Sequence, residues 1–215
     1  MAGILITRPN HDLITTYISQ WSEFIIAFAK SKSHVTYDLF GKKADRKTFE
    51  HYLVSNKPSF LFLNGHGSSD VICGYRDEVL LDNASDSTLI QGKIIYARSC
   101  NAGENLGNTL VTKGVVAFVG YKKSFSIAMQ NKFAVRPKED PLARFFLEPS
   151  NLIASTIIKG NTVQEAYQRS MREMKKTLSE MISSNIPNKK DYAFALYNNM
   201  ISQVVIGNKE AKIPI

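Results

Sequence analysis

Two side chains that combine in nucleophilic catalysis, an imidazole and a thiol, each follow an apolar run in this sequence. His66 follows the run 59–63, and Cys100 follows the run 94–97. A thiol becomes a nucleophile when it loses its proton, and a nearby imidazole can take that proton and later pass it to a leaving amine. His66 and Cys100 therefore suggest acyl-transfer chemistry, if the fold brings them together.

Backbone groups beside these two residues could supply the rest of such a site. Acyl transfer needs N–H groups aimed at the developing oxyanion, and glycine lets a substrate carbonyl approach closely. We expect the N–H groups of Gly67 and Cys100 to form this oxyanion hole. A helix predicted over 104–112 would point its N-terminus towards Cys100 and favour the thiolate. The alternative is structural: His66 in a glycine turn and Cys100 as a small buried residue.

Strand-like and helix-like segments alternate along the chain, which is typical of a mainly parallel α/β sheet. Strands are predicted at 4–7, 35–39, 59–63, 94–97 and 115–119. In open α/β sheets, functional groups gather on the loops at the carboxyl ends of the strands. If the third and fourth of these strands are neighbours, the loops that carry His66 and Cys100 meet.

Helices are predicted by three- and four-residue apolar spacing and by capping residues. They are expected from Asp12, after Asp45, over 104–112, from Leu142, from Thr162 and over 192–199. The first helix is expected to bury one apolar face, made of Ile14, Tyr17, Ile18, Trp21, Phe24, Ile25 and Phe28. A last, edge strand is predicted at 203–206, and Cys73 is expected on a short strand.

The segment 121–139 is basic and has no helical or strand pattern, so we expect an exposed loop. Structureless stretches of this length are uncommon without a function. The loop could gate the site or be cleaved by the protein itself near Glu139 or Asp140. A variable surface loop without such a role is the alternative.

Composition limits the class of protein. The chain has 215 residues, 44% of them apolar, and no repeat or linker divides it, so we expect one domain over 1–215. Its two cysteines are too few for a disulfide scaffold, and the sequence start does not resemble a secretory signal, so a cytoplasmic location is expected. The longest apolar runs, such as 115–119, are far shorter than the roughly 18 residues of a membrane-spanning helix.

A formal net charge of +8 is compatible with a nucleic-acid partner, an acidic protein partner or a basic surface. The lysine pairs at 122–123, 175–176 and 189–190 are dispersed and belong to no nucleic-acid-binding motif. Nucleic acid is therefore not expected as a direct ligand.

The stretches 60–67, 94–103 and 114–120 together resemble the caspase-like cysteine peptidases of clan CD, and most of all their bacterial CHAT and gingipain-like branch. The shared pattern is an apolar strand ending in His-Gly, a second ending in a small residue and Cys, and a third preceded by Gly. It covers about residues 58 to 121. Caspases proper are excluded, because Arg98-Ser99-Cys100 does not match Gln-Ala-Cys and only 34 residues separate His66 from Cys100.

The resemblance implies a three-layer caspase-like fold and a cysteine endopeptidase with His66 as base, Cys100 as nucleophile and Gly67 as oxyanion donor. It implies no metal or organic cofactor. It also implies a specific protein substrate, a separate activator or sensor protein, and a setting in bacterial defence or cell death. A catalytically silent caspase-like interaction module is the alternative.

Specificity could depend on two arginines. In clan CD the residue two before the nucleophile commonly lines the specificity pocket, and here it is Arg98, while Arg8 ends the first predicted strand. Two guanidiniums would favour cleavage after an acidic residue. Alternatively Arg98 pairs internally with Asp70, Asp77 or Glu78, or a pocket formed by Asp38 or Asp70 favours a basic residue.

Two further interpretations are weaker. The stretch 65–70 follows a strand like a nucleotide-binding fingerprint, but it lacks the third glycine and a clear following helix. A zinc site made of His66, Cys73 and Cys100 has none of the usual ligand spacings, and Cys73 is expected to be a structural thiol.

Overall fold

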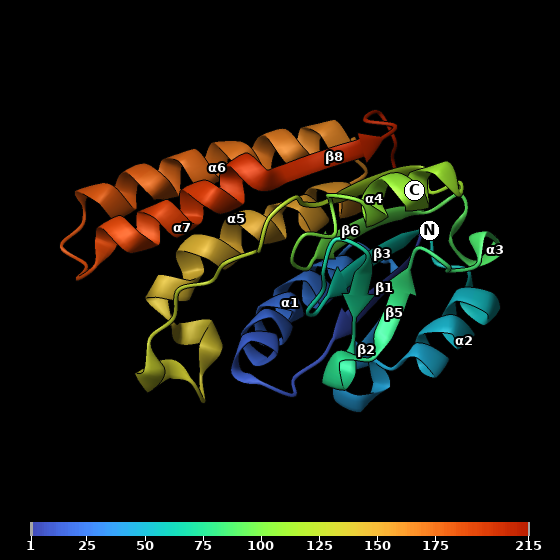
Figure 1. Cartoon of the computed structure of the whole chain (residues 1–215), viewed down its shortest axis with the longest axis horizontal. Coiled ribbons are helices and arrows are strands. Elements are labelled where there is room, and N and C mark those ends of the chain that lie inside the picture. Colours follow the sequence, from blue (N-terminus) through green and yellow to red (C-terminus); the bar gives the residue numbers. More distant parts are fainter. Residues whose placement is uncertain (1, 215) are drawn as a thin grey trace.

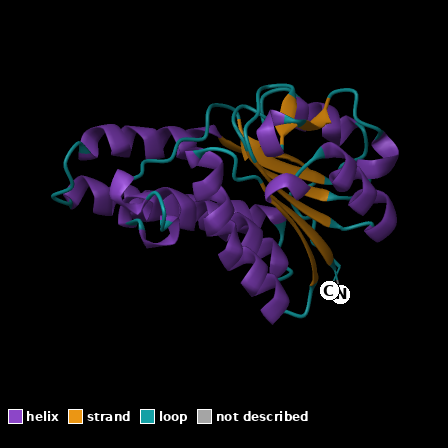
Figure 2. Ribbon diagram, turned by 90° about the horizontal axis from the view of Figure 1, so that it is seen from below, coloured by secondary structure: helices purple, strands orange, loops and turns teal. Residues whose placement is uncertain are grey.

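The computed structural model describes residues 2–214, and its centre is a six-stranded sheet with helices on both faces (Figures 1 and 2). The strands are β1 (Gly3–Arg8), β2 (Val35–Phe40), β3 (Phe60–Asn64), β6 (Ile94–Arg98), β7 (Ala117–Tyr121) and β8 (Gln203–Gly207). Their order in the sheet is β2-β1-β3-β6-β7-β8, with β8 antiparallel to β7 and all other pairs parallel. The predicted mainly parallel, three-layer α/β fold is confirmed.

Helices of very different length connect these strands. They are α1 (Leu13–Ser31), α2 (Arg46–Asn56), α3 (Ser87–Ile90), α4 (Leu106–Thr112), α5 (Pro141–Ile158), α6 (Val163–Ser183) and α7 (Lys189–Ser202). Short 3-10 turns lie at η1 (Gly41–Lys43), η2 (Tyr75–Asp77), η3 (Asn131–Phe133) and η4 (Pro137–Glu139). A small antiparallel hairpin, β4 (Val71–Cys73) and β5 (Val79–Asp82), lies outside the main sheet. Within residues 2–214, no helix is both long and apolar enough to span a membrane.

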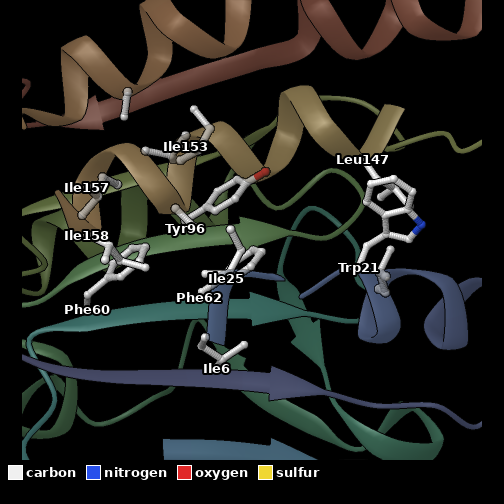
Figure 3. Packing of buried hydrophobic residues seen from close by; sticks show 14 of the residues in the cluster. Ile6, Trp21, Ile25, Phe60, Phe62, Tyr96, Leu147, Ile153, Ile157 and Ile158 are labelled. Atoms are coloured by element: carbon white, nitrogen blue, oxygen red, sulfur yellow. The ribbon is translucent and has the colours of Figure 1, made fainter. Parts of the chain in front are cut away.

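The sheet is apolar on both faces because helices cover both. One face presents Phe60, Phe62 and Tyr96 to helices α1 and α5, and the rings of Phe62 and Tyr96 stack at 4.9 Å (Figure 3). The opposite face presents Leu61 and Ile95 to α2, α4 and the hairpin. Strands covered on both faces read as continuous apolar runs, as 60–63 does here. Helix α6 packs against both α5 and α7, and α7 runs directly into the edge strand β8 (Figure 1).

Several predicted boundaries need correction. The strand predicted at 115–119 is β7 at 117–121, because Val115 still bonds back to the end of α4, through its N–H and the Leu110 carbonyl. The first helix buries Tyr17 and its neighbours, but Ile14 and Phe24 lie at the margins of that face and are 38% and 50% exposed. The edge strand near 203–206 and the short strand at Cys73 are confirmed, whereas β5 and α3 were not predicted.

Candidate functional site

The strand register places His66 and Cys100 at the same edge of the sheet. Strands β3 and β6 are parallel neighbours, and their last paired residues are Asn64 and Arg98. His66 and Cys100 each come two residues after that pair. The two loops therefore leave the sheet side by side at its carboxyl edge, as the sequence predicted.

Direct contacts fasten these loops to each other. The hydroxyl of Ser99 donates a 2.9 Å hydrogen bond to the carbonyl of His66, and that carbonyl also accepts from the N–H of Cys73. Gly67 fits tightly between the loops: a Cβ atom added there would collide with Ser99 Oγ and lie 2.6 Å from the carbonyl oxygen of Val71. The backbone position of His66 is thus set by the segment that carries the candidate nucleophile.

Gly67→Ala is expected to displace the His66 loop, because the new methyl group has no space. A misplacement of about 1 Å at a catalytic group can cost roughly 100-fold in rate, so we expect alkylation of Cys100 to slow by about that factor. Gly92→Ala, before the start of β6 and so at the opposite end of that strand from Cys100, is the control: no atom lies within 4 Å of its Cβ, although its φ of +75° strains an alanine as well. Equal alkylation rates in the two folded variants would contradict this reading of Gly67.

The backbone donors expected at the site are available. Among residues 2–214, the N–H groups of Gly67 and Cys100 donate to no hydrogen-bond acceptor. Buried or half-buried N–H groups are nearly always paired, so two unused donors on adjoining loops can serve an incoming carbonyl oxygen. This arrangement fits the predicted oxyanion hole.

Asp12 is a site residue that the sequence analysis missed. Its carboxylate oxygen Oδ2 lies 2.6 Å from His66 Nε2, although 54 residues separate the two in sequence. Asp12 comes just after β1, the neighbour of β3 on the side away from β6. The same carboxylate caps α1, through its other oxygen, by accepting from the Thr15 N–H at 2.7 Å. Its double use as helix cap and histidine partner fixes its position.

The contact with Asp12 determines which nitrogen of His66 can act as a base. Burial alone would raise the pKa of Asp12, but hydrogen bonds from His66 and from Thr15 lower it below its usual value. An ionised Asp12 accepts the proton on Nε2, which leaves the lone pair of His66 on Nδ1. An imidazole held in this tautomer can take a proton from a thiol, and the carboxylate stabilises the imidazolium that forms.

Asp12→Asn is expected to slow the reaction of Cys100 with an alkylating reagent by roughly 10- to 100-fold, because the amide cannot stabilise an imidazolium. Asparagine is as good a helix cap as aspartate, so the free energy of unfolding should change little. Asp45→Asn, at the equivalent cap of α2, is the matched control and should leave alkylation unchanged. Unchanged alkylation in Asp12→Asn would show that the carboxylate does not act on His66.

The surroundings of Cys100 are formed by the loop after β7. Its sulfur lies 4.0 Å from the carbonyl oxygen of Phe125, and the thiol is half-buried. Helix α4 begins only at Leu106, later than predicted, and has seven residues, so it does not start at Cys100. The second thiol differs: Cys73 is buried, and burial together with the Asp77 carboxylate raises its pKa. Cys73 has the structural environment that the sequence suggested.

The segment 121–139 is irregular, as predicted, but it is anchored at several points. The side chain of Asn199 on α7 bonds both the N–H and the carbonyl of Ser126, at 2.8 and 2.7 Å. Asp140 is fully buried, caps α5 and accepts from Tyr17 and from the Gln130 N–H. Cleavage beside Asp140 would require this cap to open, so the structure disfavours that expectation.

The two arginines expected in a specificity pocket are engaged within the protein. Arg98 is buried, and all five of its guanidinium N–H groups donate to neutral acceptors at 2.6 to 3.0 Å. Arg8 forms ion pairs with Asp38, at 2.8 Å, and with Glu23, at 3.1 Å. Arg98 therefore does pair internally, but with none of the acidic residues suggested for it. In this structure neither arginine offers the free guanidinium that an acidic cleavage preference would need.

Comparison with known proteins supports the fold of this site. No family model and no curated protein sequence matches the chain. A solved structure, the complex of the pro- and mature domains of Porphyromonas gingivalis RgpB, superposes with a TM-score of 0.57 at 13% sequence identity. The match covers 99% of this chain and 48% of that one, so the chain spans about half the length of its structural neighbour. At this identity the similarity shows that the two chains share a fold.

Proposed function

We propose that this protein is a cysteine endopeptidase in which Cys100 is the nucleophile, His66 the general base and acid, and Asp12 the residue that orients His66. The single observation that carries the proposal is the geometry at the sheet edge. His66 and Cys100 lie on neighbouring loops that are hydrogen-bonded to each other, and Nε2 of His66 is bonded to a carboxylate at 2.6 Å.

The proposed reaction uses these residues as follows. His66 Nδ1 takes the thiol proton, the sulfur attacks the peptide carbonyl, and the N–H groups of Gly67 and Cys100 stabilise the oxyanion. When the C–N bond breaks, His66 returns the proton to the amine, which leaves a thioester on Cys100. Water then attacks the thioester and gives one proton to His66, which passes it to the departing sulfur and so restores the free thiol. The second proton of the water stays on the new carboxylic acid, which releases it to solvent as the carboxylate product leaves.

The substrate is proposed to be a specific protein segment, because the half-buried Cys100 is bordered by the anchored loop that carries Phe125. A separate activating protein and a role in bacterial defence are implied by the family resemblance alone and stay predictions.

The test is covalent labelling with peptidyl chloromethyl ketones that differ only in the residue next to the reactive group. We expect one modification per chain, located on Cys100 by mass spectrometry, with a preference among the peptides. Labelling should be lost in Cys100→Ala and kept in Cys73→Ala, and His66→Ala should react more slowly. Reaction of Cys100 at the same slow rate with every reagent, and in His66→Ala, would support a catalytically silent module instead.

A further inference from the structure

His11, next to Asp12, is a partly buried histidine whose two ring nitrogens are buried and make no hydrogen bond. Its side chain is only 11% exposed, and neither of its ring nitrogens has a hydrogen-bond partner among the described residues. The ring packs edge-on against the rings of His66 and Tyr75, at centroid distances of 5.8 and 5.5 Å. A buried polar group without a partner is costly, so an unpaired imidazole beside a candidate active site calls for an explanation.

The atoms around His11 form a compact set of donors. His11 Nε2 lies 3.7 Å from Asp12 Oδ2 and 3.4 Å from Asp77 Oδ1. Asp12 Oδ2 is in turn bonded to His66 Nε2. One ligand atom from each of His11, Asp12 and His66 lies within 4.8 Å of the others. Asp77, on η2, is 61% exposed and can adjust its position.

These separations suit a tetrahedral metal ion. Zinc binds nitrogen and oxygen at about 2.0–2.2 Å, which places neighbouring tetrahedral ligands roughly 3.3–3.6 Å apart. The two contacts of His11 Nε2 already have nearly this length. His66 Nε2 and Asp12 Oδ2 are too close, at 2.6 Å, and have to move apart by about 1 Å when the metal replaces the hydrogen bond, while the exposed Asp77 has to move towards the other three ligands. Two imidazoles and carboxylate oxygens are donors that zinc favours.

We propose that His11, Asp12 and His66 form a zinc-binding site, with Asp77 as the fourth ligand. This set differs from the thiol-containing set considered from the sequence, since it includes neither Cys73 nor Cys100. Zinc gives His11 Nε2 the partner that it lacks in the protein alone.

Zinc at this site would inhibit the enzyme, a consequence that rests on the proposed function. Metal coordination uses the lone pair on His66 Nε2, so the proton of the neutral imidazole moves to Nδ1. The nitrogen that should take the thiol proton then carries a proton itself. Asp12 is removed from His66 by the same event, so zinc disables both the base and the group that orients it.

The test measures metal binding without using activity. The Cys100→Ala protein is titrated with Co²⁺, whose visible absorption reports tetrahedral coordination, and then with Zn²⁺ in competition with a chromophoric chelator. We expect one ion per chain, the same affinity in Cys100→Ala, Cys73→Ala and the unmodified protein, and no thiolate-to-metal absorption. His11→Phe, which keeps the ring packing, should weaken binding by roughly 100-fold, and Asp77→Asn by about 10-fold.

The outcomes separate this site from the proposed function. Metal affinity that is equal in His11→Phe and the unmodified protein, or lost in Cys100→Ala, would overturn the site. If His11→Phe fails to fold, unchanged affinity in Asp77→Asn together with unchanged His11 imidazole NMR signals on adding Zn²⁺ would overturn it as well. Zinc binding as described in a protein that fails the labelling test would leave the site in place and overturn only the inhibition.

Discussion

Replacing Cys100 by alanine is expected to abolish peptide hydrolysis, lowering turnover by roughly 10⁴-fold or more. Without the sulfur no thioester can form, and the remaining groups provide only binding and an oxyanion hole. The measurement is digestion of a mixture of unfolded proteins, with the new termini mapped by mass spectrometry. Cys73→Ala is the control, because Cys73 is buried with a raised pKa and takes no part in the reaction.

A double variant makes this prediction sharper. When two residues act as one unit in a reaction, the effects of their substitutions on the rate are strongly non-additive. The His66→Ala Cys100→Ala protein should therefore be no slower than Cys100→Ala alone. His66→Ala alone should already lose most of the turnover. If the losses of turnover in the two single variants multiply in the double variant, His66 and Cys100 do not act on the same step. The proposed dyad would then be wrong, although each residue affects turnover.

The sequence was sufficient for the sheet and for placing the loops of His66 and Cys100 at one edge of it, and the reason is local. Both residues directly follow apolar runs that are covered on both faces, and parallel strands bring their carboxyl ends to one edge. The order of these two strands in the chain matches their adjacency in the sheet, with β3 beside β6. No long-range information was needed beyond that adjacency.

Asp12 could not be recognised in the same way, because its relation to His66 depends on strand order. The chain runs β1, β2, β3, but the sheet runs β2-β1-β3, so the loop after β1 lies beside that of β3. An acidic residue at the end of a strand was a usable signal. Asp12 also begins a helix as its N-cap, and from the sequence alone that role accounts for the residue.

Strand periodicity determines the face of β6 on which the side chain of Arg98 lies, and this face is not the solvent-exposed one that a specificity pocket needs. Alternate residues of β6 point to the same face, so Arg98 shares its face with Tyr96, on the side packed against α1 and α5. The guanidinium lies over the Phe62 ring, at 5.0 Å from its centroid. Its acceptors come from three separate elements, a combination that no local pattern shows.

Arg98→Met is expected to lower the free energy of unfolding by about 3 kcal/mol. The guanidinium joins β3, through Asn64, to α5, through Ser150 and Asn151, and to α1. Its loss leaves two buried amide oxygens without donors, at roughly 1–3 kcal/mol each, partly offset because a cation is no longer buried. Urea denaturation of the folded variants measures the difference.

Arg8→Met is the matched control, because Arg8 is also a buried arginine but its two charged partners are not buried, although its guanidinium also donates to the buried Ser19 carbonyl at 3.2 Å. The carboxylates of Asp38 and Glu23 are 31% and 37% exposed, so water can replace the guanidinium and the cost should be about 1 kcal/mol. Burial lowers the pKa of Arg98 to about 10. Between about pH 6 and 8, well below this pKa, Arg98 carries its proton in both the folded and the unfolded protein. The free energy of unfolding lost in Arg98→Met should therefore be constant over this range. A loss no larger than that of Arg8→Met would show that the Arg98 hydrogen bonds do not hold α1, α5 and the sheet together.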